Sequence, residues 1–105
     1  MEREKVYEVK IAPVAYHDIS RHFYFLAKVS KEAAKRLKIT LLGDIRSLKN
    51  MPQRHPVFER RGTTPGKYRQ MISAGRYRIV YQIVQDEVRV DGVEDCRQDN
   101  ESKTT

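Results

Sequence analysis

The sequence predicts an α+β domain in which an antiparallel helical hairpin packs on one face of a mainly antiparallel four-stranded sheet. Three observations support this class: an alternating segment near the start, two apolar stripes at helical spacing, and three strand-like segments joined by short turns. The resulting order is strand, helix, helix, strand, strand, strand. Each helix has one apolar face, and a sheet is the surface on which both faces can be buried.

The first two elements are a strand and a helix. In the strand, apolar side chains alternate with charged ones, as expected when one face is buried; its apolar members are Tyr7, Val9 and Ile11. Pro13 suits the first turn of the helix, where its missing N–H is not needed, although Ala12 is a poor cap. Residues 14–29 then carry apolar side chains at helical spacing, at Tyr16, Ile19, Phe23, Leu26 and Ala27.

The second helix is predicted from Ser30 to about Asn50. Ser30 is a good N-cap, and Glu32 in the first turn is favoured by the helix dipole. A one-sided apolar stripe follows, formed by Ala34, Leu37, Leu41, Ile45 and Leu48. Met51-Pro52 ends the helix, because the residue before a proline is driven out of the helical region.

The C-terminal half is predicted as a loop followed by a meander. Residues 52–66 are rich in proline and glycine and form the loop, which Val57 and Phe58 attach to the core. Three strands follow, in KYRQMIS, RYRIVYQIV and EVRVDGVED, with turns at 73–76 and 85–87. Residues 1–99 are therefore taken as one domain, and residues 100–105 as a polar tail that frays.

Composition narrows the class of partner. The chain has 105 residues, of which 39% are hydrophobic, and a net charge of +7. Such an excess of cations suggests a polyanionic partner, such as nucleic acid or an acidic protein. No apolar run is long enough to cross a membrane, the N-terminus does not resemble a signal peptide, and Cys96 is the only cysteine. We therefore expect a cytoplasmic protein.

Cations gather in residues 60–78, a segment without any acid; they are Arg60, Arg61, Lys67, Arg69, Arg76 and Arg78. Side chains alternate across a strand, so Tyr77 and Ile79 share the face under the helices while Arg76 and Arg78 project from the open face. A turn of two or four residues centred on Ala74-Gly75 would place Arg69 opposite Val80, beside Arg78. A three-residue loop would turn Arg69 to the other face.

The predicted binding patch on the open face therefore comprises Arg69, Arg76 and Arg78, with Arg61 nearby in the loop. Arg97 joins it if the last strand keeps its register, and Gly92 marks a possible bulge there. If these guanidinium groups are functional, they grip phosphate or stabilise charge at a scissile phosphodiester. The competing interpretation is that they form salt bridges with the acidic segment that begins at Glu94.

The sequence contains few other candidates for catalytic or metal-binding residues. His17, His22 and His55 are the side chains suited to acid–base work at neutral pH, and Asp18 lies four residues before His22. No cluster completes a metal site around that pair, so neither a metal nor a cofactor is predicted. We interpret His55 as solvated and Cys96 as a semi-buried thiol.

The element order, the helix end SLKNMP and the segment KYRQMISAGRYRIVYQIVQDEVRVDGVEDCRQD resemble the RelE/ParE superfamily of bacterial type II toxins over roughly residues 5–99. The long helical hairpin is more similar to the ParE branch. The resemblance implies the fold derived above and an acidic, partly disordered antitoxin as partner. It implies either inhibition of DNA gyrase by binding, as in ParE-like members, or ribosome-dependent cleavage of mRNA, as in RelE-like members.

For the RelE-like alternative, the resemblance places catalytic arginines at Arg69, Arg78 and Arg97, and the chain would then be an endoribonuclease. Met71 stands at a second lysine position of that branch, Cys96 stands where a histidine often precedes the late arginine, and no aromatic residue follows Tyr81. These departures favour the gyrase inhibitor. A degenerate member that only binds a partner is a third alternative.

Overall fold

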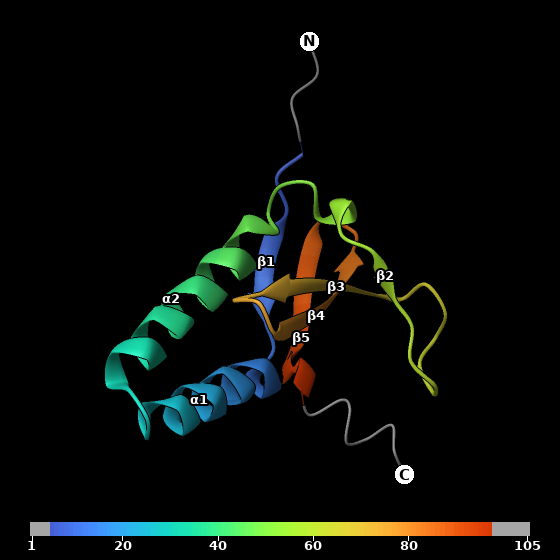
Figure 1. Cartoon of the computed structure of the whole chain (residues 1–105). Helices are drawn as coiled ribbons and strands as arrows, with labels where there is room; N and C mark the ends of the chain where they lie inside the picture. Colours follow the sequence, from blue (N-terminus) through green and yellow to red (C-terminus); the bar gives the residue numbers. More distant parts are fainter. Residues whose placement is uncertain (1–4, 98–105) are drawn as a thin grey trace.

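The computed structural model describes residues 5–97 (Figure 1). Its elements are β1 (Glu8–Ile11), α1 (Pro13–Ala27), α2 (Lys31–Ser47), the short 3-10 helix η1 (Pro52–Arg54), β2 (Val57–Phe58), β3 (Tyr68–Ser73), β4 (Tyr77–Val84) and β5 (Glu87–Asp95). The strands form one sheet in the order β1-β5-β4-β3-β2. β1 pairs with β5 in parallel, and the remaining pairs are antiparallel. The predicted class and element order are confirmed.

The sheet has five strands rather than the predicted four, because Val57 and Phe58 pair with Arg69 and Tyr68 at the edge of β3. Two residues flanked by prolines and glycines give too short a pattern to indicate a strand. The prediction that these two side chains attach the loop to the core is wrong: Val57 is 40% exposed, neither residue belongs to the core cluster, and the loop is attached by backbone pairing.

Both helices begin as their sequences predict. Pro13 opens α1 without a side-chain cap on Ala12, whereas Ser30 Oγ accepts a hydrogen bond of 3.1 Å from the N–H of Ala33. α2 ends at Ser47, three residues before its predicted end, and Met51 then turns back with a φ of 48°. In residues 5–97, neither helix is long and apolar enough to cross a membrane.

The core lies between the helical hairpin and one face of the sheet (Figure 1). Leu41 and Ile45 of α2 and Ile79 and Tyr81 of β4 are completely or almost completely buried. Tyr81 also donates a hydrogen bond of 2.6 Å from its hydroxyl to the carbonyl of Pro52, which holds η1 against the sheet. The prediction that Tyr77 and Ile79 face the helices is confirmed, and Tyr81 continues the same alternation.

The register between β3 and β4 differs from the favoured prediction. Arg69 pairs with Tyr81 rather than Val80, because Ser73 pairs with Tyr77 across a three-residue loop. Ala74 and Gly75 in this loop have φ of 52° and 79°. Since directly opposed residues share a face, Arg69 lies on the side of the core and Arg78 on the open side.

A β-bulge sets the faces of β5. Val80 pairs with Gly92 and Tyr81 with Val90, so Asp91 is an extra residue, as the sequence suggested for this position. Beyond the bulge, Val93 faces the core and Glu94 lies opposite Arg78 on the open face. Asp18 of α1 accepts a hydrogen bond of 3.0 Å from the Val93 N–H and so ties the bulge to the helix.

Candidate functional site

The open face of the sheet carries an arginine–carboxylate cluster at its centre. Glu94 accepts two hydrogen bonds of 2.9 and 2.6 Å from the guanidinium of Arg60, a forked geometry typical of strong arginine–carboxylate pairs. Arg78 reaches the same carboxylate at 3.3 Å and donates a bond of 2.7 Å to the side-chain oxygen of Gln70. We call Arg60, Arg78, Glu94 and Phe58 the open-face cluster.

Phe58 of β2 lies against both cations of this cluster. The guanidinium carbons of Arg60 and Arg78 are each 4.7 Å from its ring centroid, within the range of cation–π attraction. Arg78 is only 15% exposed in its side chain. The guanidinium groups of the cluster are thus held in place by the fold, in contact with one carboxylate and one aromatic ring.

A pocket adjoins this cluster on the same face. Its lining includes Tyr68 of β3, Val80 of β4 and the bulge residue Gly92, together with Phe58 and Glu94. The lining is part aromatic and part charged. Tyr68 faces this side because it pairs with Phe58.

Arg69 does not join the open-face cluster, contrary to the predicted patch. One of its terminal nitrogens donates to the carbonyls of His55 and Gln53, at 2.6 and 3.2 Å. Its guanidinium therefore holds the segment after η1 against the edge of the sheet. This is a positioning contact inside the chain, made from the face opposite to Arg78.

Arg76 is also withdrawn from the open face. It ends the β3–β4 loop and folds over the ring of Tyr77, at 5.2 Å from the centroid, with 3.6 Å between its guanidinium and the Asp95 carboxylate. Tyr77 and Asp95 lie opposite each other on the side of the helices. The prediction that Arg76 and Arg78 project together is therefore wrong, because the loop residue does not continue the alternation of the strand.

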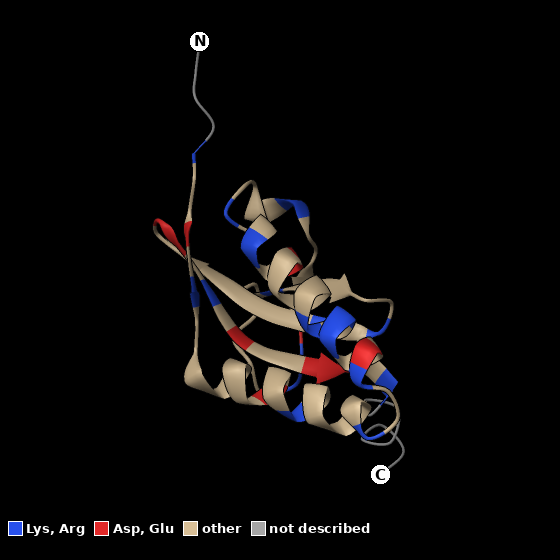
Figure 2. Cartoon of the chain, turned by 90° about the vertical axis from the view of Figure 1, so that its left-hand side faces the viewer, with Lys and Arg blue, Asp and Glu red and all other residues tan. Residues whose placement is uncertain are grey.

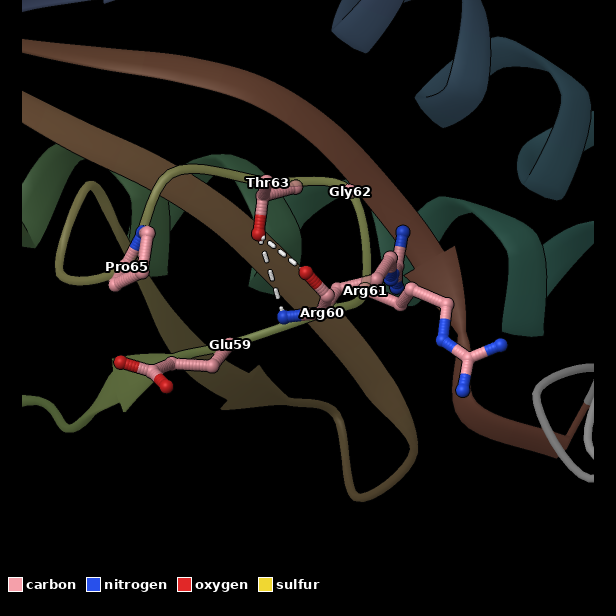
Figure 3. A pocket seen from close by; sticks show the side chains of 6 residues that line it. All are labelled: Glu59, Arg60, Arg61, Gly62, Thr63 and Pro65. Atoms are coloured by element: carbon pink, nitrogen blue, oxygen red, sulfur yellow. Dashed lines mark hydrogen bonds between the residues drawn. The ribbon is translucent and has the colours of Figure 1, made fainter.

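The last two predicted arginines are exposed at separate places. Arg97 is 64% exposed and lies 3.8 Å from Asp95, on the side of Arg76. Arg61 belongs to the loop after β2, whose turn is closed by Thr63 through its hydroxyl and the backbone of Arg60 (Figure 3). In that view the two arginine side chains extend to one side of the loop, away from Glu59 and Pro65.

The histidines occupy structural positions. His22 is buried, donates from Nε2 to the Val93 carbonyl at 2.7 Å and packs on Tyr77. His55 is not fully solvated as predicted: it is half-buried, packs edge-on against Tyr81, and burial, followed by the charge of Arg54, lowers its pKa. Within residues 5–97 no group of three or more potential metal ligands gathers around Asp18 or elsewhere.

A second cationic surface lies on α2 and was not singled out from the sequence. Residues 28–49 hold seven Lys or Arg against Glu32 and Asp44 alone, a signal that was available in the printed sequence. Figure 2 shows Lys and Arg recurring along this helix. We define the α2 cation row as the exposed residues on its outer side, Lys31, Lys35, Lys38, Arg46 and the following Lys49.

The fold of a helical hairpin on one face of a mixed sheet is also found in solved structures of toxin–antitoxin systems. A structure titled as the chromosomal ParDE TA system from P. aeruginosa matches with a TM-score of 0.69 and 12% identity, covering 86% of this chain and 96% of that one. The RelBE2 toxin–antitoxin complex from Mycobacterium tuberculosis matches with a TM-score of 0.58 and 19% identity, covering 90% and 97%. Identities this low indicate the fold alone.

The family itself is given by the sequence. A family model described as the ParE toxin of the type II toxin–antitoxin system parDE matches residues 9–100. The chain therefore belongs to the ParE toxin family. No curated protein matches it.

Proposed function

We propose that this ParE-family toxin inhibits DNA gyrase by binding to it, without catalysis of its own. The observation that carries the proposal is the ParE family match over residues 9–100. The target is the one that the ParE branch implies, and the proposal extends it to this chain. The arginines of the open face then serve as contacts to a protein–DNA machine rather than as groups that act on a scissile bond.

The positions of the three candidate catalytic arginines support binding over RNA cleavage. Arg69 and Arg78 lie on opposite faces of the sheet, and each is engaged inside the chain. Arg97 lies beside Asp95 on the side of the helices. An endoribonuclease needs its cations around one phosphodiester. These three do not share a site, so the ribosome-dependent alternative has less support.

We further propose that an acidic antitoxin covers the end of the hairpin. At the end of α1 and the start of the connection to α2, Tyr24, Phe25 and Val29 are 68%, 65% and 83% exposed, an unusual set of apolar side chains to leave in water. A nearby groove has Leu26, Leu37 and Tyr77 in its lining together with two cations, Arg36 and Arg76. An amphipathic segment with acidic side chains is complementary to such a groove.

The test is a supercoiling assay with purified gyrase and purified toxin. We expect the toxin to block supercoiling, and an acidic antitoxin, if an adjacent reading frame encodes one, to restore it. Arg61→Ala should weaken the inhibition by about tenfold, the scale of one charge-assisted contact, since Arg61 is exposed and makes no ion pair within residues 5–97. Arg21→Ala on α1, which removes an exposed arginine that is ion-paired to Asp18, is the control for loss of charge alone. Cleavage of ribosome-bound mRNA with normal supercoiling would reject the proposal.

A further inference from the structure

The α2 cation row has a regular geometry. Lys31, Lys35, Lys38 and Arg46 follow one another at intervals of four, three and eight residues. At 100° and 1.5 Å per residue they lie within an arc of about 80° and extend along about 22 Å of the helix. Neither acid of the helix falls on this arc, because Glu32 and Asp44 point at least about 40° outside it.

The row is not neutralised by the protein. Among the described residues, the ion pairs involve cations of the N-terminal strand, of α1 and of the C-terminal half, for example Lys5, Arg21 and Arg60. None involves a member of the row. Residues 28–49 contribute seven cations and two acids, a net +5 out of the +7 of the whole chain.

The arrangement is unfavourable for the helix itself. Lys31 occupies the first position of α2, where the helix dipole favours an anion. Lys31 and Lys35 form a like-charge pair at the spacing that places side chains next to each other. Such charges raise the free energy of the isolated domain slightly, and a polyanion bound along the row would reverse that effect.

We propose that the α2 cation row binds the phosphate backbone of double-stranded nucleic acid. Four of its five members are lysines, a residue depleted from protein–protein interfaces but suited to phosphate contacts. The ring that Lys38 contacts, Phe23, is half-buried, whereas single strands need exposed aromatic side chains on which their bases stack. Lys38 and Arg46 are eight residues apart, about 12 Å along the axis, similar to the width of a B-DNA major groove.

This surface is made of residues other than those proposed to bind the target and the antitoxin, although Lys38 lies 5.7 Å from the ring of Phe23 and so brings the row next to α1. The open-face cluster lies on the side of the sheet away from the helices, and the exposed aromatic residues Tyr24 and Phe25 belong to α1. The inference therefore does not rest on gyrase inhibition. It also predicts contacts that are independent of base sequence, because lysines that reach phosphates carry no base readout.

The experiment measures binding of the purified full chain to fluorescein-labelled 20-base-pair DNA and RNA duplexes by anisotropy, between 50 and 200 mM salt. With about four phosphate contacts, the logarithm of the association constant should fall against the logarithm of salt with a slope of about −3.6. The Lys35→Gln/Lys38→Gln variant should reduce this slope to about −1.8. Its affinity at 0.1 M salt should fall roughly 50-fold.

The matched control is Lys5→Gln/Lys10→Gln, which removes the same charge from two exposed lysines that are ion-paired to Asp86 and Glu87. Circular dichroism of both variants verifies that the fold is intact. Equal loss in the two variants, or no duplex binding by the parent chain, would overturn the proposal. So would a poly-glutamate peptide that binds the row as tightly as the duplexes, because the partner would then be an acidic protein. Preference for one duplex over the other identifies DNA or RNA as the source of the phosphates.

Discussion

The open face of the sheet and the outer side of α2 are both cationic, but they differ in how their charges are balanced. On the sheet, Arg60 and Arg78 share the carboxylate of Glu94 and the ring of Phe58. On the helix, the α2 cation row has no carboxylate partner among residues 5–97. The charges of the open-face cluster are therefore stabilised by neighbouring groups, whereas the like charges of the α2 cation row slightly lower the stability of the domain. Four measurements of stability test this contrast.

The largest effect is expected for Glu94→Gln. The change leaves Arg60 and Arg78 facing each other across a neutral amide, with Arg78 mostly buried. We expect the free energy of unfolding to fall by about 2 kcal/mol, since the forked hydrogen bonds of Arg60 and the ion pair of Arg78 lose their anionic acceptor. Urea unfolding measures it. A change no larger than that of an exposed control, Glu59→Gln, would show that the cluster contributes no more than a surface charge.

A smaller effect is expected for Tyr81→Phe, which removes the hydroxyl bond to the Pro52 carbonyl. Leaving that carbonyl unpaired should cost about 1 kcal/mol of unfolding free energy. Burial raises the pKa of Tyr81 to about 12 from 10.0, so the parent chain keeps this contribution below pH 10 and loses it as the pH rises through the folded value. The phenylalanine variant should lack that alkaline loss, and thermal melts across this range would reveal whether it does.

The third effect has the opposite sign. Lys31→Glu places an anion at the start of α2 and next to Lys35, so it should stabilise the domain by about 0.5 kcal/mol. The same substitution at Lys10, which is paired with Glu87 at 2.9 Å and has its pKa raised by that bond, should destabilise it. Denaturation of the two variants at low and high salt is the measurement, because screening should reduce both differences. If both substitutions destabilise the domain, Lys31 makes a favourable interaction in the folded protein, and the contrast between the two surfaces is wrong.

The smallest effect concerns pH and His55. Its pKa is lowered, first by burial and then by Arg54, so as the pH falls the unfolded chain takes up the proton before the folded one. The unfolding free energy should therefore decline as the pH drops below 6.5 and level off below the folded pKa. His55→Gln should flatten this part of the profile, and His17→Gln, at an exposed position of α1, should not. Identical profiles for the two variants would remove His55 as the cause.

The sequence was sufficient for the elements whose side-chain pattern is long and regular. Helical spacing predicted both helices, and strict alternation predicted that Tyr77 and Ile79 face the core. The register of β3 could not be obtained this way, because it depends on whether the loop at 74–76 has two, three or four residues. Ala74 adopts a positive φ there, a conformation that is rare for alanine and that the sequence therefore does not indicate.

The candidate site was predictable only in part for the same reason. Arg78 was placed on the correct face, and a salt bridge to the segment beginning at Glu94 was the competing interpretation that the structure bears out. The face of Arg69 was predicted wrongly because the register between β3 and β4 was wrong. The face of Arg76 was predicted wrongly because this residue belongs to the loop before β4 and not to the strand. The position of Phe58 on the open face could not be predicted, because a strand of two residues is too short to show an alternating pattern. The α2 cation row needed only a count of charges along one helix.

The extra residue in β5 has a consequence for which lengths of this strand can be tolerated. Before Asp91 the inward side chains are Val88 and Val90, and after it they are Val93 and Asp95. Deleting one residue at 91 or 92 would restore simple alternation with Val93 still inward and the Glu94 carboxylate still on the open face, because Val90 and Val93 would then be two positions apart. A single-residue deletion at this point should therefore be tolerated by the fold, as should a change in the length of the glycine-rich loop after β2, which moves none of these side chains.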